Sequence, residues 1–418
     1  MAKLIRRLAA LAAPLAFILA VALPALADTY IVNDIADIAD DNIGDGICHT
    51  ASGTCTLRAA VQEANAHAGA DSISFPAGTY VLTQTGFGED NAVTGDLDIT
   101  GNLVITGTGA ATTIVDGNRT DRVFHILVSS GQAVALSGLT VRNGNAHPDG
   151  ANGISSGGGI FMDYQSTLTL PGVDVLGNSA GSGGGVNNYN GILTINGGRV
   201  ESNTTQYEGG GIGSGGYYYA SSGSGSAPSE DKTPKPIQRV PGPADFGQMG
   251  LVRGPITATA TLTQTQSPAA RLPAPNANAT AFAFDTIILN ATTIANNFAD
   301  GYGGGGVYAS GPLTVTDSLI VSNTTGNLHG YGDGAGIEIY DQYFISGTRF
   351  ISNTALFDDD DDSGGFQFPN LQAGTYTLTE IQPAAYTDGA DAAGTLGGTV
   401  SNDQIANIFV GDAGYGQG

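Results

Sequence analysis

A repeat with one asparagine at a fixed place constrains the fold of this 418-residue chain more than any other feature. The pattern L-x-[LIV]-x(4)-[VIF]-x-x-N recurs without gaps, and successive copies start 25, 26 or 30 residues apart where no insertion intervenes. Its asparagines are Asn178, Asn203, Asn297, Asn323 and Asn353, and the copies that end in Asn297 and Asn353 begin with Ile287 and the aromatic Tyr343 in place of Leu. Units that cannot bury their apolar face alone have to stack on one another. The chain is therefore expected to form a solenoid.

The residue types within one unit indicate what kind of solenoid this is. Apolar residues two apart, such as Leu168 and Leu170, predict a strand with one face turned inward. Glycine clusters ahead of an aliphatic residue, as in 157–160, predict turns with positive φ. The asparagine is expected to accept a positive φ in a turn and to stack its amide on the asparagine of the next coil. Each unit has room for about three short strands, and eight or nine such coils would stack as a parallel β-helix. A β-propeller is the alternative, but it needs repeats near 40 residues.

Composition agrees with a β-rich, acidic protein. The chain has 64 Gly, only 12% charged residues and a formal net charge of −24. A helical bundle or coiled coil would need many more Ala, Glu, Lys and Leu. Nucleic acid is excluded as a partner, because phosphate binding needs clustered Lys and Arg. Peripheral binding to anionic lipid is disfavoured for the same reason.

Residues 1–27 predict a secretory signal peptide. Three basic residues fall within the first seven, residues 8–23 are apolar, and Ala25-Leu26-Ala27 matches a small-residue cleavage site. A retained N-terminal membrane anchor is the alternative. After signal removal no stretch is long and apolar enough to span a bilayer. We expect a secreted protein, either extracellular or held at the cell surface.

Export makes a disulfide between the only two cysteines plausible. Cys48 and Cys55 have six residues between them, including Gly and Ser, which allow a tight loop to close. Two free thiols are less expected in an oxidising compartment, and a redox role lacks the C-x-x-C spacing. We predict a structural disulfide.

One insertion interrupts the repeats and divides the predicted coils into 79–213 and 280–357. Residues 214–279 are rich in Ser, Pro, Ala and Thr, and Asn203 and Asn297 lie 94 residues apart instead of 25 to 30. Such a composition predicts a mostly disordered surface loop. A partner-binding arm is the functional alternative, and no motif supports it.

The segment ahead of the coils carries a recognisable motif, D-G-I-C-x(6)-C-T-L-R-A-A-V-Q-E-A-N. It resembles the N-terminal motif of secreted bacterial β-helix proteins of the CSLREA type, with Ala59 where that family has an acidic residue. By pattern, an amphipathic helix is expected here, with one apolar face made of Leu57, Ala60, Val61 and Ala64. Residues 28–78 are predicted to be a cap that covers the open edge of the first coil.

Two further resemblances complete the organisation. The G-G-G-[IV] clusters and the F-x-x-N element at Phe350 to Asn353 are similar to polymorphic outer-membrane-protein repeats. From Gly364 onward, the tail resembles the second half of the B-type modules of Gram-positive adhesins (Cna-B and serine-aspartate-repeat proteins). Together these resemblances imply an all-β, right-handed parallel β-helix of the pectin-lyase-like kind, with an N-terminal helical cap. Residues 358–418 would add an Asp-rich linker and a small partial β-sandwich.

A run of five aspartates is the sharpest charge feature. These carboxylates repel one another unless they are solvated or neutralised by a cation such as Ca²⁺. The run therefore predicts either a solvated linker or a Ca²⁺ site, and no other cofactor is expected. Its members are Asp358, Asp359, Asp360, Asp361 and Asp362.

Parallel β-helices often act on polysaccharides, so an enzyme needs to be considered. Two or three converging carboxylates would suit a hydrolase, and acids beside a basic residue would suit a lyase. The candidates are Asp96, Asp98, Asp116 and Asp121 near Arg119, Arg122 and Arg142. The five histidines are scattered without metal-ligand spacing. The leading hypothesis is a non-catalytic adhesive or structural protein that binds an extracellular polysaccharide or a cell-surface component; a polysaccharide lyase or glycoside hydrolase is the alternative.

Overall fold

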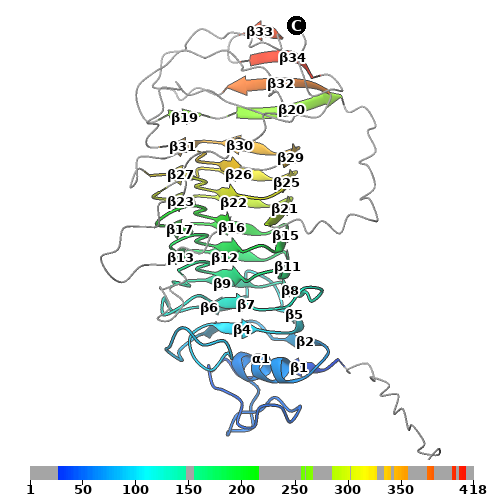
Figure 1. The fold of residues 1–418 in the computed structure, drawn as a ribbon, viewed down its shortest axis with the longest axis vertical. Coiled ribbons are helices and arrows are strands. Elements are labelled where there is room, and N and C mark those ends of the chain that lie inside the picture. The colour runs from blue at the N-terminus through cyan, green and yellow to red at the C-terminus, as the bar shows by residue number, and fades with distance from the viewer. Residues whose placement is uncertain are drawn as a thin grey trace, which may run out of the picture.

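A computed structural model shows short strands stacked along one axis (Figure 1). It describes residues 27–146, 155–215, 256–258, 260–266, 285–301, 303–326, 334–339, 343–355, 374–380, 398–401 and 404–410. The predicted signal peptide up to residue 26, the Asp358–Asp362 run and most of the predicted insertion 214–279 lie outside the described residues.

Four sheets run along the stack, and the first of them, sheet A, has nine strands. These are β1 (Thr29–Ile31), β2 (Ala70–Ser74), β5 (Asn102–Thr106), β8 (Val134–Ser137), β11 (Thr167–Pro171), β15 (Ile192–Asn196), β21 (Thr286–Asn290), β25 (Leu313–Thr316) and β29 (Tyr343–Ser346). Successive neighbours are parallel and in register, as Leu168 opposite Leu193 and Leu170 opposite Ile195 illustrate.

Sheets B and C supply the second and third walls. Sheet C consists of β4 (Leu97–Ile99), β7 (Phe124–Ile126), β10 (Ile160–Met162), β14 (Val186–Asn188), β18 (Ile212–Ser214), β24 (Val307–Ala309) and β28 (Ile337–Ile339). The coil strands of sheet B are β3 (Gly78–Val81), β6 (Thr113–Asp116), β9 (Thr140–Arg142), β12 (Asp174–Leu176), β16 (Arg199–Glu201), β22 (Thr293–Ala295), β26 (Leu319–Val321) and β30 (Arg349–Ile351).

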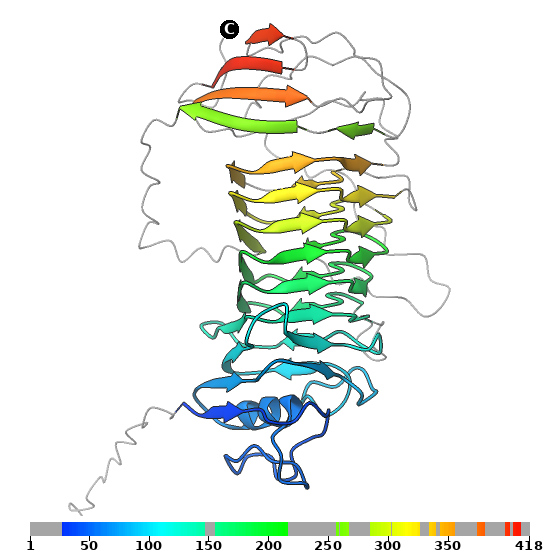
Figure 2. The ribbon, with the colours of Figure 1, turned by 180° about the vertical axis from the view of Figure 1, so that it is seen from behind.

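Sheet D adds one more short element to the later coils. Its coil strands are β13 (Ser179–Ala180), β17 (Thr204–Thr205), β23 (Phe298–Ala299), β27 (Thr324–Thr325) and β31 (Asn353–Ala355). A later coil thus passes through C, A, B and D in turn and has four strands where the sequence predicted about three. All pairs between these coil strands are parallel, an arrangement consistent with a parallel β-helix (Figure 2).

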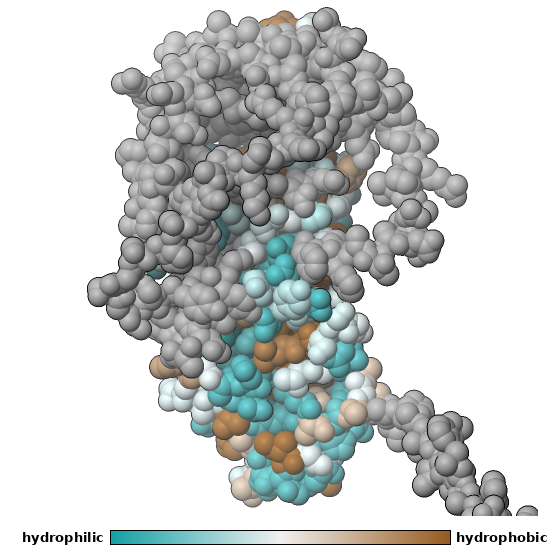
Figure 3. All heavy atoms as spheres, in the orientation of Figure 1, coloured by the Kyte–Doolittle hydropathy of each residue, from teal (hydrophilic) through white to brown (hydrophobic). Residues whose placement is uncertain are grey.

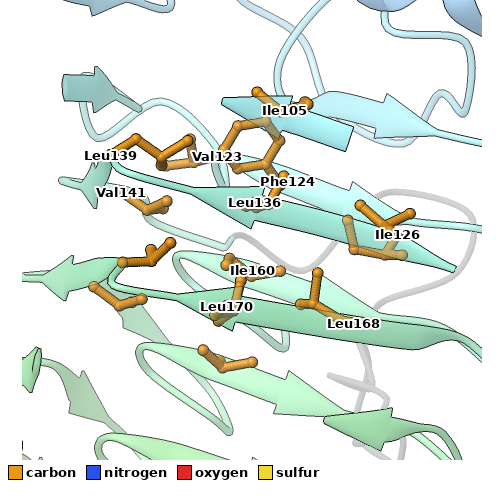
Figure 4. Close-up of a cluster of buried hydrophobic side chains, with 14 of the residues drawn as sticks. Ile105, Val123, Phe124, Ile126, Leu136, Leu139, Val141, Ile160, Leu168 and Leu170 are labelled. Carbon is orange, nitrogen blue, oxygen red and sulfur yellow. The ribbon is translucent and has the colours of Figure 1, made fainter. Parts of the chain in front are cut away.

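The core is a set of aliphatic columns inside the coils. Inward residues of sheets A, B and C, such as Leu136, Val141 and Ile160, are fully buried. Figure 4 shows that such side chains from successive coils point toward one another between the sheets. Each large aliphatic side chain removed from water contributes about 1.5–3 kcal/mol, so stacking supplies what a single coil lacks.

The one helix of the described residues, α1 (Leu57–Ala66), packs beside β2 and β4 near the N-terminal end of the stack (Figure 1). It begins after Thr56, whose hydroxyl accepts a hydrogen bond from the Ala59 amide at 3.1 Å. The predicted apolar face is buried, but so are Arg58, Gln62 and Glu63. The helix is therefore enclosed on more sides than an amphipathic pattern implies.

Two strands lie among the described residues of the predicted insertion 214–279. β19 (Ile256–Ala258) pairs antiparallel with β31, and β20 (Ala260–Gln266) lies between β30 and β32 (Gly374–Glu380). β34 (Gln404–Val410) and β33 (Thr399–Ser401) continue this antiparallel group (Figure 1). An open edge on the last coil would leave backbone N–H and C=O groups unpaired; β19 and β20 pair with that edge.

Candidate functional site

The five predicted ladder asparagines form one column where each coil turns from sheet B to sheet D. The amide nitrogen of Asn203 donates to Oδ1 of Asn297 at 3.0 Å and to the carbonyl of Val175 at 3.0 Å. The backbone N–H of Asn203 donates to the same Oδ1 at 3.0 Å. The pattern repeats from Asn178 to Asn353. In Asn178, Asn203, Asn297 and Asn323 both amide hydrogens and the oxygen are used, so these side chains hold the turns together.

One expectation about these turns was wrong. The ladder asparagines do not have positive φ; the residue just before each of them does. These preceding residues have φ between 51° and 62°, and they are Gly177, Ser202, Asn296, Ser322 and Ser352. Tertiary packing explains the shift: the ladder asparagine has to point inward, so the chain makes its left-handed bend one residue earlier, where the side chain faces solvent or is absent.

Two separate requirements of the fold call for glycine in these clusters. The first glycine of a cluster takes a positive φ, as Gly183 does with 59°. The next, Gly184, lies where a Cβ would approach the carbonyl oxygens of Gly210 and Thr204 to 2.5 Å. The clusters therefore serve turn geometry and close contact between coils, and carry no chemistry of their own.

The polar residues of α1 fix the chain around them. Arg58 is fully buried; its Nε lies 2.6 Å from Oδ1 of Asp37, and its guanidinium donates to the carbonyls of Ala92, Gly95 and Asp96 at 2.8–3.2 Å. Two further side chains of α1 act in the same way. Gln62 binds Ala92, and Glu63 accepts the backbone N–H groups of Gly44 and Gly46. The amphipathic pattern predicted only the apolar face of α1, although Arg58, Gln62 and Glu63 belong to the same L-R-A-A-V-Q-E motif.

The predicted disulfide is present. Cys48 and Cys55 are joined, with 5.2 Å between their Cα atoms. The bond closes the loop directly before α1, so it ties that loop to the start of the helix.

The candidate catalytic residues fall into two groups on different sheets. Asp116 and Arg142 lie on β6 and β9 of sheet B and pair at 2.7 Å. Arg119 is exposed in the turn after β6 with a φ of 58°. The others lie on or just before β4 and β7 of sheet C, namely Asp96, Asp98, Asp121 and Arg122. The structure therefore divides the predicted acids and bases between two places: Arg142 meets Asp116 on sheet B, and Arg122 pairs with Asp96 at 3.3 Å beside sheet C.

A smaller group does converge on sheet C, and we call it the Asp98 cluster: Asp90, Asp98 and His125. Asp98 and His125 are opposite one another on β4 and β7. Nδ1 of His125 lies 3.2 Å from Oδ1 of Asp98 and 3.8 Å from Oδ1 of Asp90. The Asp98 side chain has no exposed surface, whereas that of Asp90 is 64% exposed.

The surroundings of Asp98 favour its neutral form. Burial and the nearby carboxylates of Glu89 and Asp90 raise the pKa of Asp98 to about 8, although the Ala92 N–H and Arg122 oppose the rise. Arg122 itself faces Oδ2 of Asp96 at 3.3 Å. His125 was not predicted as a site residue because it lies 27 positions after Asp98 in the sequence. Only the register of the coils places the two side by side.

A second feature covers most of the stack's length, and we call it the sheet A face: the outward positions of β5, β8, β11, β15, β21, β25 and β29. Among these described strands, no outward position holds a charged side chain. The residues are Asn102, Val104, Thr106, Ala135, Ser137, Thr167, Thr169, Pro171, Ile192, Thr194, Asn196, Thr286, Ile288, Asn290, Thr314, Thr316, Phe344 and Ser346. All of them are half-buried or exposed.

Neighbouring side chains on the sheet A face are linked along the stack. Asn290 donates to Asn196 at 2.8 Å, and Thr316 donates to Asn290 at 2.6 Å. Sheet B differs, since Arg199 on its outer side pairs with Asp174 at 2.7 Å and Glu201 at 2.9 Å. Among the coloured residues of Figure 3, hydrophobic side chains lie in small groups between hydrophilic ones, a distribution normal for a protein surface.

Within the described ranges, no helix is long and apolar enough to cross a membrane. No protein-family model matches the chain, and no curated protein matches it either.

Proposed function

We propose that this protein is a secreted or cell-surface β-helix rod with a non-catalytic adhesive or structural role, and that its sheet A face binds an uncharged polysaccharide. One observation carries the proposal: seven consecutive described strands turn only uncharged side chains outward in a chain with a net charge of −24. Hydroxyl and amide groups are the partners that sugar hydroxyls need.

The geometry of the stack suits a repeating ligand. Strands recur about every 4.8 Å, and each of the seven strands turns at least one hydroxyl or amide side chain outward, with apolar residues such as Val104 and Ile288 between them. Many weak contacts along one polymer add up, because each additional contact is formed at high effective concentration. An anionic polymer would meet the repulsion of the acidic protein.

The remaining parts of the proposal concern organisation. We assign α1 the role of an N-terminal cap, because it is buried on several sides against the first coils. The same proposal includes export directed by residues 1–27 and right-handed coils. It also includes kinship with CSLREA-type proteins and a partial B-type module within residues 358–418. The alternatives of a Ca²⁺ site or a solvated linker at Asp358–Asp362 stay predictions.

A polysaccharide lyase or hydrolase is the second candidate, and the Asp98 cluster favours it. A carboxyl group with a pKa of about 8 keeps its proton at neutral pH and can act as a general acid. A second carboxylate, that of Asp90, has an oxygen within 4.8 Å of it. The absence of exposed surface on Asp98 counts against this candidate, since a substrate has to reach the acid.

The experiment measures retention of the purified protein on insoluble cellulose and chitin, with polygalacturonate as an anionic polymer, while reducing ends and unsaturated products are followed for a day. Retention on a neutral polymer without products supports the proposal. Products from any polymer would contradict the non-catalytic role, and loss of product in Asp98→Asn would assign catalysis to the Asp98 cluster. A lack of retention on every polymer would contradict polymer binding.

A matched pair of variants tests the face itself. Thr169→Lys with Thr194→Lys places two charges side by side on the sheet A face, because these residues are opposite one another on β11 and β15. Leu176→Lys with Thr293→Lys adds the same charge to sheet B. The first pair should weaken retention at least about tenfold, the equivalent of about 1.4 kcal/mol, and the second should leave it unchanged. Equal effects would show that the sheet A face is not the binding surface.

A further inference from the structure

We propose that the Asp98 cluster is a binding site for a divalent transition-metal cation of the Zn²⁺ type. The proposal does not depend on polysaccharide binding, because the cluster lies on sheet C and the proposed polymer surface lies on sheet A. It rests on the positions of Asp90, Asp98 and His125.

The spacing of the three side chains fits one small ion. Their candidate ligand atoms all lie within 4.8 Å of one another. Zinc bonds to nitrogen and oxygen are about 2.0–2.2 Å long, so two ligands of a tetrahedral ion lie about 3.4 Å apart. The distances from His125 Nδ1 to Asp98 and Asp90, 3.2 and 3.8 Å, fall on either side of that value. An ion can therefore be accommodated with small side-chain movements.

One buried oxygen independently points to a cation. Oδ2 of Asp98 accepts the Ala92 N–H at 2.7 Å, but Oδ1 accepts no hydrogen bond and is buried. Oδ1 is the atom that faces His125. A buried carboxyl oxygen without a hydrogen-bond partner is costly unless a proton or a cation neutralises it. A metal ion shared with the imidazole would meet that need.

The scaffold holds Asp98 in place through its neighbours. Arg58 and Gln62 both donate to the carbonyl of Ala92, the residue whose N–H orients the Asp98 carboxylate. Asn65 donates to the carbonyl of Asp98 itself at 2.7 Å. Such outer contacts fix the direction of a metal ligand and raise its affinity. The α1 residues that the sequence motif contains would thus support the site.

The charges around the cluster also favour a cation. Glu89 and Asp90 are close enough to influence Asp98, and Arg122 is the opposing positive group. Arg122 pairs with Asp96 at 3.3 Å, which offsets part of its charge. Asp90 is largely exposed, so an ion can enter from its side. One imidazole and two carboxylates suit Zn²⁺, Co²⁺ or Mn²⁺, whereas Ca²⁺ prefers six or more oxygen ligands.

A second group of the same composition serves as the comparison. Asp40, Asp41 and His49 also have ligand atoms within 4.8 Å of one another. However, Oδ1 of Asp40 accepts the Asn42 N–H and Oδ2 accepts the His49 N–H, both at 2.9 Å. Asp40 is therefore already satisfied by the backbone, and we expect no metal there.

The test titrates the purified, EDTA-treated protein with ZnCl₂ and, separately, CaCl₂ by calorimetry. Visible absorption after addition of CoCl₂ provides a spectroscopic readout of nitrogen and oxygen ligands. We expect one equivalent of Zn²⁺ to bind. Asp98→Asn and His125→Gln should each weaken binding by at least about 10–100-fold, because losing only an outer contact of a metal ligand already costs that much affinity. His49→Gln should bind as the parent protein does.

The replacement residues Asn and Gln can still form hydrogen bonds, so the variants are expected to fold. Circular dichroism and the melting temperature establish that each variant is folded. The proposal is overturned if the parent protein binds no Zn²⁺, if Ca²⁺ binds more tightly, or if His49→Gln loses binding as much as His125→Gln does.

Discussion

The N-terminal coils and the later coils hold similar turns with different chemistry. Before residue 146, buried ion pairs hold the structure together: Arg58–Asp37 ties α1 to the segment before it, and Arg122–Asp96 connects neighbouring coils. From Asn178 onward, neutral amides do so through the ladder. A neutral amide gives the same hydrogen bonds at every pH, whereas an ion pair depends on both charges. The two regions should therefore respond differently to mutation, pH and salt.

The largest effect is expected from Arg58→Met. Removing the guanidinium leaves the Asp37 carboxylate, which is 3% exposed, without its countercharge. Breaking a buried pair from one side costs about 3–5 kcal/mol of unfolding free energy. Urea denaturation followed by circular dichroism measures the loss. The double variant Arg58→Met with Asp37→Asn should recover part of it, and a double variant no more stable than the single one would contradict the role of the charge.

The next effect tests the ladder at its centre. Asn297→Ala removes the oxygen that accepts both the backbone and the side-chain N–H of Asn203. Each buried donor left without a partner costs about 1–3 kcal/mol, so we expect a loss of about 2–4 kcal/mol in urea denaturation. Asn290→Ala on the exposed sheet A face is the control and should cost less than about 1 kcal/mol. Equal losses would show that the ladder adds no stability beyond a surface amide.

Titration should distinguish the two regions next. The raised pKa of Asp98, about 8, means that the folded protein holds this proton more tightly than the unfolded chain does. Between about pH 4 and pH 8 the folded state thus binds more protons, and stability decreases as pH rises through this interval and levels off above it. In metal-free protein we expect a change of up to a few kcal/mol. Asp98→Asn should flatten this profile, while Asn297→Ala should leave its slope unchanged; an unaltered slope in Asp98→Asn would contradict the assignment.

The same contrast explains what could be predicted from the sequence. A fixed asparagine and alternating aliphatic residues, such as Leu168 and Leu170, determine the stacking because every coil repeats them. The turn was displaced by one residue to Ser202 because inward packing decides which residue bends. His125 stayed hidden, since its distance from Asp98 depends on the length of an irregular early coil. The antiparallel strand β20 was missed because its partners, β30 and β32, are distant in sequence.

The smallest effect concerns an ion pair on the outer surface of the later coils. Arg199 contacts Asp174 at 2.7 Å and Glu201 at 2.9 Å, but its side chain is 49% exposed. Water and salt screen such a pair, so Arg199→Ala should cost less than about 1 kcal/mol in urea denaturation, and less still in 1 M NaCl. The Arg58–Asp37 pair should keep most of its effect at that salt concentration, because buried charges are screened much less. If Arg199→Ala lowered the unfolding free energy as much as Arg58→Met does, burial would not be what makes the N-terminal ion pairs strong.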